Sequence, residues 1–493
     1  MKIGIIVNHI EGGGLENLLI NITKELLEHN EIEFITTVEE GSWVNKVLEL
    51  GVKVFNFNTW TYKDPVTYIE KLAEFINSRT YSTIFLNNSI HGMIATSFID
   101  CTTKKVAVLH GIERDIFKLT TTKASSIDQF IAISPLTYQL LVEKNIENVS
   151  LIPNGIYLSK ERETQYHSEI KLKLIFAGRI SHSDKGALFV PEIFRRIKMK
   201  INSCELIVLG DGPDLNKFKE LIKKYELHGV TKYFGMVDSE IVLNEMSECH
   251  FLLFPSIHEG FGLSIIEAQS VGCIPVATEI VGVTDYLINN HIDGILINSL
   301  DVDDFSNEIV SVYKDKELMD YLSKNAMKNA EKFNIKETAT KWLEISMDNK
   351  VGRSGGATTG IKDIICMLNY KGSKNVILKK NEWLCNYYYR KHSNLAIIKK
   401  SSRIIIFGTL ETAYYIYIDA LKHGLSIVAF IDNYSNKEQI NSITIWNNEK
   451  MCERADEFDV VISSIDSNNG DIIIEEIKRI LPGKFVIDWK EIN

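Results

Sequence analysis

The sequence lacks several features that would place a protein in a membrane, in an oxidising compartment or on nucleic acid. Among its 493 residues, no apolar run approaches the roughly 20 residues that a membrane-spanning helix needs. The seven cysteines are scattered, odd in number and without a C-x-x-C pair, which favours reduced thiols in a cytoplasm. The net charge of −10 argues against nucleic acid as a partner. We therefore expect a cytoplasmic protein, and peripheral contact of a locally basic face with the inner face of a membrane stays open.

The N-terminus also lacks the pattern of a secretion signal. Met1–Val7 is a short apolar run that predicts a first strand, and a glycine loop, Gly12–Gly14, follows where a signal peptide would have its cleavage site. Hydrophobic residues at 45% and charged residues at 24% are ordinary for a globular protein. The length is sufficient for about three domains. None of these features indicates an oligomeric state.

The most informative stretch of the sequence runs from Phe254 to Gly272. It begins at the end of an apolar strand, passes a Gly-Phe-Gly loop and opens a helix near Leu263. Glu259 lies on the loop before this helix, and Glu267 lies one turn after Leu263. Two carboxylates thus bracket a helix start, with seven residues between them.

The backbone of the same loop is suited to an anion. The N–H groups of Phe261, Gly262 and Leu263 are among those that a helix start leaves without an intrahelical acceptor. Gly260 and Gly262 let this backbone approach a ligand closely, because they carry no Cβ atom. Donors for a phosphate beside carboxylates for hydroxyl groups favour a nucleotide-sugar as the ligand.

The spacing of Glu259 and Glu267 resembles the E-x7-E signature of retaining glycosyltransferases of the family 4 type. This resemblance implies the α/β fold called GT-B, in which two Rossmann-like domains face a cleft. It also implies that Glu267 accepts hydrogen bonds from the ribose diol of the donor and that Glu259 holds hydroxyl groups of the transferred sugar. The alternative is an ordinary strand–loop–helix with two unrelated glutamates.

A second motif precedes this stretch. The strand Leu172–Ala177 is followed by Gly178-Arg179 and, after a short loop, by Lys185-Gly186, a pair that resembles the G-R…K-G motif of the same family. Cations at Arg179 and Lys185 can grip a diphosphate through charge-assisted hydrogen bonds that strengthen as the nucleotide departs. The resemblance implies that they act in place of a metal, so we expect no metal and no other required cofactor. Two exposed surface cations are the alternative.

The N-terminal half offers two more candidates. The loop Gly12–Gly14 follows the first strand without the G-x-G-x-x-G spacing, so a tight strand-to-helix turn is its alternative explanation. The resemblance implies that this loop approaches the donor diphosphate and sugar. His110 lies just past the strand Val106–Leu109, where ligands collect in α/β sheets. The resemblance implies that His110 faces the donor sugar, and a purely structural histidine at a strand end stays open.

Two further segments of the second half bear on the donor. The resemblance implies that the base lies against the backbone near Met236 and Val237, after the strand Val230–Phe234. Asp301-Val302-Asp303 is formally a D-x-D sequence, a metal-binding signature in other glycosyltransferases. Here Ser299 or Asp301 fits better as the cap of a helix starting near Asp304, because acids favour a first helical turn.

These motifs divide the chain into domains. We expect an N-terminal Rossmann-like domain on the acceptor side over residues 1–165 and a donor-binding domain over residues 166–332. The resemblance implies that a helix at residues 333–350 crosses back onto the first domain. A glycine- and serine-containing linker is expected at residues 351–375, and a C-terminal Rossmann-like domain at residues 376–493.

The C-terminal domain departs from the family pattern. Strand, helix and strand are followed by Asp432, as in a small Rossmann domain, but the fingerprint keeps only Gly408 of three glycines. Leu410 would crowd a pyrophosphate, so the domain need not bind NAD. The aromatic and basic segment Asn386–His392 can contact an acceptor or a membrane, with a packed helix face as its alternative. Nucleotide-sugar binding, protein contacts and a structural role all stay open for this domain.

The sequence therefore predicts a retaining glycosyltransferase of the hexosyl or N-acetylhexosaminyl type. It would move a sugar from a nucleotide-diphosphate sugar, expected to be UDP-linked, to a glycan, lipid-linked or protein acceptor in envelope polysaccharide biosynthesis. The alternatives are a GT-B nucleotide-sugar epimerase, a non-catalytic nucleotide-sugar-binding protein, and an oxidoreductase centred on the C-terminal domain.

Overall fold

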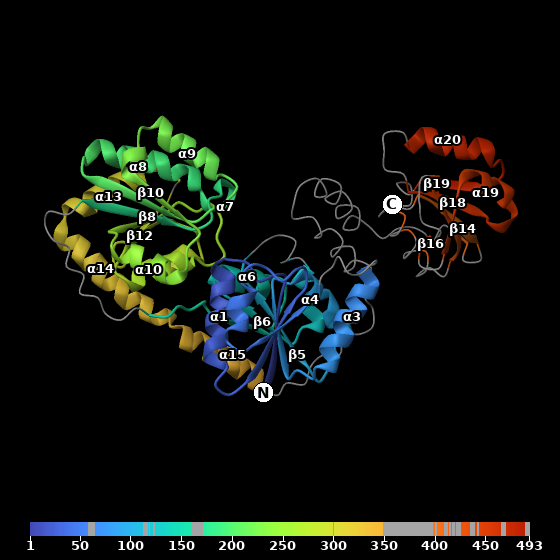
Figure 1. The fold of residues 1–493 in the computed structure, drawn as a ribbon, viewed down its shortest axis with the longest axis horizontal. Coiled ribbons are helices and arrows are strands. Elements are labelled where there is room, and N and C mark those ends of the chain that lie inside the picture. Colours follow the sequence, from blue (N-terminus) through green and yellow to red (C-terminus); the bar gives the residue numbers. More distant parts are fainter. Residues whose placement is uncertain are drawn as a thin grey trace. The chain divides into compact units, whose positions relative to one another are not determined.

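A computed structural model of the chain is shown in Figure 1. The structure describes residues 1–57, 65–111, 117, 119–121, 124–158, 171–298, 300–348, 398–399, 402–408, 413, 416, 420, 425–433, 439–440, 443–464 and 470–488. The expected linker at residues 351–375 and the aromatic and basic segment at residues 386–392 lie outside these ranges. Two compact units divide the chain, Met1–Thr358 and Thr359–Asn493.

The first sheet of the first unit is parallel, with seven described strands in the order β3-β2-β1-β4-β5-β6-β7. Its central strands are apolar and buried, as expected when helices cover both faces of a sheet. The strands are β1 Lys2–Val7, β2 Glu31–Thr36, β3 Lys53–Asn56, β4 Thr83–Asn87, β5 Lys104–Leu109, β6 Gln129–Ala132 and β7 Val149–Leu151. The described helices are α1 Gly14–Leu26, α2 Val44–Leu48, α3 Pro65–Ser78, α4 Ile90–Ala95 and α6 Pro135–Glu143.

The second sheet of this unit is also parallel, in the order β10-β9-β8-β11-β12-β13 over the described strands. These are β8 Leu172–Ala177, β9 Cys204–Leu209, β10 Thr231–Gly235, β11 Phe251–Phe254, β12 Ile274–Thr278 and β13 Ile295–Ile297. Its described helices are α7 His182–Lys185, α8 Val190–Lys200, α9 Leu215–Lys224, α10 Ser239–Ser247, α11 Leu263–Ser270, α12 Thr284–Leu287, α13 Val302–Lys314 and α14 Lys316–Ala330. Because all described strands within each sheet are parallel, the carboxyl ends of the strands and the loops that follow them lie along one edge of that sheet.

Helix α15, Ile335–Met347, returns from the second sheet to the first and packs beside α1 (Figure 1). Trp342 is 2% exposed, and its ring stacks on Phe85 of β4 at a centroid distance of 4.4 Å. Thr338 Oγ1 donates to the carbonyl of Pro153 at 3.0 Å, so the segment that follows β7 is fastened to this helix. A helix that follows the second sheet in the chain therefore packs on the first sheet.

The second unit contains a sheet in the order β16-β17-β15-β14-β18-β19 over its described strands. These strands are β14 Arg403–Phe407, β15 Ser426–Ile431, β16 Gln439–Ile440, β17 Ile443–Trp446, β18 Val460–Ser463 and β19 Phe485–Asp488. All pairings are parallel except that of β16 with β17, a short hairpin that the sequence did not reveal. Its described helices are α19 Asn448–Glu453 and α20 Gly470–Ile480. Most of the altered glycine fingerprint, residues 409–412, lies outside the described residues.

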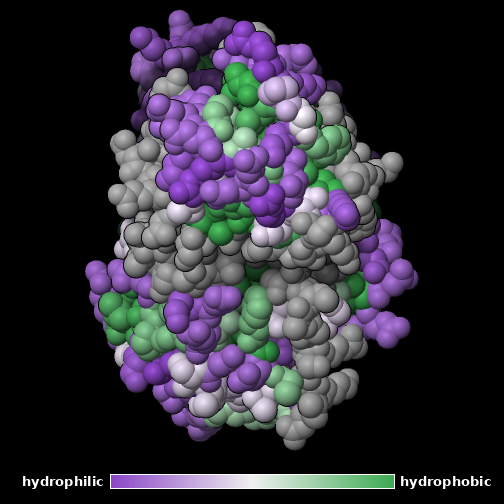
Figure 2. All heavy atoms as spheres, turned by 90° about the vertical axis from the view of Figure 1, so that its right-hand side faces the viewer, coloured by the Kyte–Doolittle hydropathy of each residue, from purple (hydrophilic) through white to green (hydrophobic). Residues whose placement is uncertain are grey.

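The described surface is mixed in character. On the face shown in Figure 2, hydrophobic side chains of the described residues form small separate groups among hydrophilic ones. Such scattered apolar groups are normal on a protein surface and do not by themselves mark a partner site. In the part of the chain that the structure describes, no helix combines the length and the apolar character that crossing a bilayer demands.

Candidate active site

The Phe254–Gly272 stretch folds as the sequence predicts. β11 ends at Phe254, a loop follows, and α11 begins at Leu263. Gly262, which immediately precedes the helix, has φ of +105°, a backbone conformation that favours glycine over any residue with a Cβ atom. The predicted helix start is therefore confirmed, and a glycine fixes the sharp entry into it.

The end of the loop is anchored by an aromatic ring, while three N–H groups at the start of α11 stay unbonded among the described residues. Phe261 is 3% exposed and packs edge-on against Phe333, with ring centroids 6.0 Å apart. Within the described residues, the N–H groups of Phe261, Gly262 and Leu263 have no hydrogen-bond acceptor. Three unbonded donors at the start of a helix can bind an anion such as a phosphate.

Lys185 and Glu259 form an ion pair beside this loop. Lys185 Nζ lies 2.5 Å from Glu259 Oε2, and the two side chains are 26% and 10% exposed. Gly186 makes the approach possible, because a Cβ atom there would lie 1.9 Å from the carbonyl oxygen of Pro255. The sequence singled out both charged residues separately, and the structure brings them into direct contact.

Arg179 lies at the end of β8. Its side chain is exposed, and no ion pair of Arg179 is found within the described residues. Gly178 before it has φ of +156° with open space around it, and a Cβ atom on Gly210 would lie 2.0 Å from the Gly178 carbonyl oxygen. The two glycines thus leave open space at this strand end, where the exposed side chain of Arg179 can contact an anionic ligand.

His110 follows β5 and is oriented by Asn87 at the end of β4. His110 Nε2 lies 2.9 Å from Asn87 Oδ1, while the amide nitrogen of Asn87 donates to the carbonyl of Phe85. Asn87 Oδ1 is therefore the acceptor, so Nε2 carries the proton and Nδ1 keeps its lone pair. Burial lowers the pKa of His110 to about 3, so the ring is neutral. His110 Nδ1 can therefore accept a hydrogen bond from a sugar hydroxyl group, and the neutral ring supplies no positive charge.

Loops that follow strands of the two sheets of the first unit are in contact at Gly260. A Cβ atom on Gly260 would lie 2.1 Å from the carbonyl oxygen of His110 and 3.0 Å from Gly111 Cα. A Cβ atom on Gly14 would lie 3.1 Å from Leu263 Cδ1. Residues widely separated in the sequence, from both halves of the unit, are therefore in contact at this point.

The glycine loop is backed by Trp43, which the sequence did not single out. A Cβ atom on Gly12 would lie 3.0 Å from the Trp43 ring, so the indole packs directly on the loop. Lys46 Nζ lies 3.6 Å from the centroid of that ring and forms an ion pair with Asp238. Asp238 belongs to the other half of the unit, directly after Met236 and Val237.

Met236 and Val237 follow the edge strand β10. Gly235, the last residue of β10, has φ of +69°, and its carbonyl accepts a hydrogen bond from Gly210 N at 2.7 Å. Met236 is 57% exposed, whereas Val237 packs against the core. The segment is therefore held by Val237 and exposed at Met236.

Glu267 lies one turn into α11. Its carboxylate has no hydrogen-bond partner among the described residues, and burial raises its pKa to about 7. A carboxyl group that pays this desolvation cost without a partner is typical of a binding position rather than of a structural one.

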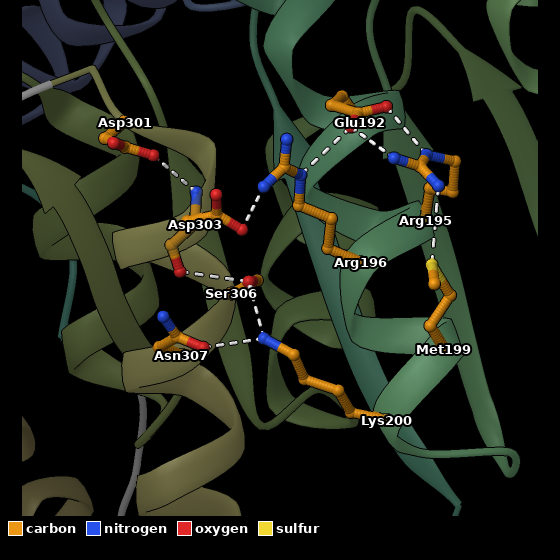
Figure 3. Close-up of polar contacts among 9 residues, drawn as sticks. All are labelled: Glu192, Arg195, Arg196, Met199, Lys200, Asp301, Asp303, Ser306 and Asn307. Atoms are coloured by element: carbon orange, nitrogen blue, oxygen red, sulfur yellow. Dashed lines mark hydrogen bonds and ion pairs between the residues drawn. The ribbon is translucent and has the colours of Figure 1, made fainter.

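The D-x-D sequence has a structural role (Figure 3). Asp301 Oδ1 accepts a hydrogen bond from Asp303 N at 2.7 Å and caps α13, which confirms the predicted cap. The helix begins at Val302, two residues before the expected start, because the cap immediately precedes it. Asp303 pairs with Arg196, which also binds Glu192 at 3.0 Å. Ser299 is outside the described residues, and among those described no group of three or more His, Cys, Asp or Glu side chains could hold a metal ion.

The chain is similar to known glycosyltransferases. Residues 159–329 match the family model of glycosyl transferases group 1. The chain is 26% identical over 182 residues to the phosphatidylinositol N-acetylglucosaminyltransferase GPI3 subunit of Saccharomyces cerevisiae, covering 35% of this chain and 40% of that protein. It is 27% identical over 217 residues to the UDP-Gal:alpha-D-GlcNAc-diphosphoundecaprenol alpha-1,3-galactosyltransferase of Escherichia coli, covering 42% and 55%. The chain thus spans about half the length of these relatives.

A solved structure resembles most of the chain. Anabaena Alr3699/HepE, in complex with UDP and glucose, matches with a TM-score of 0.62 and 17% identity, covering 71% of this chain and 100% of that one. The fold is GT-B, with a third Rossmann-like α/β unit, as predicted. The resemblance to GT-B glycosyltransferases of the family 4 type is confirmed, and the family model matches the half that carries Arg179, Lys185, Glu259 and Glu267.

Proposed function

We propose that the protein is a retaining glycosyltransferase that moves a sugar from a UDP-sugar to a glycan, lipid-linked or protein acceptor in surface polysaccharide biosynthesis. The observation that carries the proposal is the convergence at Gly260. There the Lys185–Glu259 ion pair and the unbonded N–H groups of one half meet the His110 strand end of the other. Cations, free N–H groups and carboxylates in one place suit the diphosphate and the hydroxyl groups of a nucleotide-sugar.

The donor-binding domain, residues 166–332 in this proposal, holds the nucleotide. Met236 and Val237 contact the base through their backbone, and Glu267 accepts hydrogen bonds from the ribose diol. Arg179 and Lys185 bind the diphosphate and stabilise the negative charge that grows on the leaving nucleotide. The ion pair with Glu259 fixes the position of the Lys185 ammonium group before the donor binds. The diphosphate then binds the same ammonium group together with Glu259.

The transferred sugar lies between the two halves. Glu259 accepts hydrogen bonds from hydroxyl groups of this sugar, and neutral His110 offers Nδ1 as a further acceptor. Oxygen atoms of the sugar and of the donor phosphate accept hydrogen bonds from the N–H groups of Phe261, Gly262 and Leu263. The loop Gly12–Gly14, within the acceptor-side domain of residues 1–165, closes the site. We assign the role of nucleophile to no side chain. Retention then follows from attack on the front face, with the donor phosphate accepting the proton of the acceptor hydroxyl.

The relatives support the choice of donor and acceptor. HepE binds UDP and glucose, the yeast relative is named for transfer of N-acetylglucosamine to phosphatidylinositol, and the bacterial relative for transfer of galactose to a diphosphoundecaprenol-linked sugar. We therefore propose hexosyl or N-acetylhexosaminyl transfer in the cytoplasm, with peripheral contact at the inner membrane face when the acceptor is a lipid. The C-terminal domain, residues 376–493, is proposed to recruit the acceptor or a partner protein.

The test is a transfer assay on the full chain with a panel of UDP-sugars and with glycan, lipid-linked and peptide acceptors. Glu259→Ala should lower turnover about 100-fold or more, because the sugar loses a charged hydrogen-bond acceptor and Lys185 loses its partner. Glu220→Ala, an exposed glutamate on α9, is the matched control and should keep wild-type turnover. Conversion of the donor to an epimer or free sugar, with no transfer to any acceptor, would contradict the proposal.

A further inference from the structure

Glu16 is a carboxylate that neither the sequence motifs nor the roles above use. It lies in the first turn of α1, directly after the loop Gly12–Gly14, and its side chain is half-buried. A Cβ atom on Gly13 would lie 2.8 Å from Glu16 Oε2, so the carboxylate sits directly against the glycine loop. The absence of a side chain at Gly13 is what makes room for it.

This carboxylate lacks a partner in the protein. Among the described residues, only its own backbone N–H supports its negative charge, and no other residue donates a hydrogen bond or an ion pair to it. Burial, with a smaller contribution from the nearby charge of Glu11, raises the pKa of Glu16 to about 7. A half-buried carboxyl group without a partner costs folding free energy, and such cost is concentrated at binding and catalytic positions.

The position of Glu16 relates it to the donor site. Gly14, the last residue of the loop Gly12–Gly14, approaches Leu263. Helix α11 begins at Leu263 with its unbonded N–H groups. Glu259 and Glu267 come from the donor-binding half, whereas Glu16 comes from the N-terminal half. A negatively charged side chain on that side suits a neutral hydroxyl group and would repel a phosphate.

We propose that the Glu16 carboxylate accepts a hydrogen bond from a hydroxyl group of the acceptor and holds that acceptor for transfer. The inference rests on the proposed function, since it names the acceptor-side contact of the same site. The acceptor that Glu16 recognises is a hydroxyl-bearing group, the sugar of a glycan or the head of a lipid-linked acceptor.

The test compares Glu16→Gln with Glu28→Gln, an exposed glutamate just past the end of α1, as the matched control. For E16Q, acceptor kcat/KM should fall about 10- to 100-fold, the effect of losing a hydrogen bond to a charged group, mostly through acceptor KM. The Kd of the UDP-sugar and the rate of its hydrolysis without acceptor should stay within twofold. E28Q should leave all three quantities unchanged.

A second variant guards against a trivial loss of folding. Gly13→Ala keeps an allowed extended backbone but places a methyl group against the Glu16 carboxylate, so it should raise acceptor KM in the same way. Equal losses of donor and acceptor affinity in E16Q, or wild-type kinetics in E16Q, would overturn the inference. If the wild type transfers no sugar to any acceptor, the proposed function fails instead, and the two failures are distinguishable.

Discussion

The second sheet of the first unit and the sheet of the C-terminal unit are alike around their first strand and differ at the strand ends. In each, the central strand is flanked by the next strand on one side and by a later strand on the other: β8 lies between β9 and β11, and β14 between β15 and β18. In each, a glycine with positive φ follows the central strand, Gly178 at +156° and Gly408 at +114°. Ligands of such sheets bind at this place, where the strand order reverses.

What surrounds the two glycines is different. Among the described residues, apart from Gly178 and its two chain neighbours, no atom lies within 4 Å of a Cβ position on Gly178, and Arg179 follows it. A Cβ atom on Gly408 would lie 2.4 Å from Ser464 Oγ, which donates to the carbonyl of Phe407 at 2.7 Å. The serine hydroxyl therefore occupies the space that stays open in the donor sheet. A shared fold does not imply a shared site, because the site is made by side chains at the strand ends.

The largest expected difference is in kcat for sugar transfer between variants of Lys185 and of Ser464. Lys185→Ala should lower kcat for sugar transfer about 100- to 1000-fold, because the departing diphosphate loses a charge-assisted donor. Ser464→Ala removes only a structural hydroxyl of the C-terminal unit and should leave kcat within twofold. Steady-state rates of both purified full-length variants give the comparison, and a larger loss in S464A than in K185A would reverse it.

A second comparison uses the glycines themselves. Gly260→Ala places a methyl group in contact with the His110 carbonyl, so the loop must shift and donor affinity should fall at least tenfold. Gly408→Ala should lower the unfolding temperature of the C-terminal unit, because alanine at positive φ costs about 1–2 kcal/mol and meets Ser464 as well. Transfer by G408A should be unaffected. Calorimetric melts with kinetics on both variants check this, and the account is in error if G260A binds donor normally.

The ionised carboxylate of Glu267 should lower the stability of the fold and strengthen donor binding. Its folded pKa of about 7 lies above the ordinary value of 4.5, so the folded state binds more protons between these values. The stability contribution of this group is therefore greatest below pH 4.5 and is lost as the pH rises through 7. Glu267→Gln should melt higher than the wild type at pH 8, while their difference vanishes near pH 4.5, and it should bind donor more weakly. Parallel melting curves across pH 4.5–8 measure the difference.

The smallest effect is expected at the Lys46–Asp238 ion pair. Both side chains are partly exposed, 38% and 66%, so the pair is worth at most about 1 kcal/mol. Lys46→Ala should raise the donor KM less than about fivefold, and 0.5 M salt should shrink the difference because ions screen exposed charges. Lys71→Ala, which breaks an exposed pair on α3, is the control. A hundredfold effect would mean that Lys46 touches substrate.

The sequence predicted the local structure of those parts of the candidate site that lie close together in the chain. Glu259, Glu267 and the glycines around Phe261 share one strand–loop–helix whose pattern is local. The apolar strands were equally predictable, because their residues are buried on both faces of a sheet. Short edge strands such as β7, β13 and β16 carry too few residues for a recognisable period.

The contacts between distant segments could not be predicted. Asn87 orients His110 and Trp43 backs the glycine loop, but neither pairing leaves a spacing in a single sequence. Glu16 follows its glycine loop by only two residues, yet its importance depends on the absence of a partner, which only the structure reveals. The same limit applied to Ser464, which lies far along the chain from Gly408.

The most direct test of the central claim is a calorimetric titration of UDP into the full-length wild type, Arg179→Ala and Asp432→Asn. Arg179 represents the donor-binding half, and Asp432 follows β15 in the C-terminal unit, where a Rossmann domain would bind ribose. The account predicts one UDP per chain, with affinity at least tenfold weaker in R179A and unchanged in D432N. Undiminished binding in R179A together with its loss in D432N would place the nucleotide site in the C-terminal unit and contradict the account.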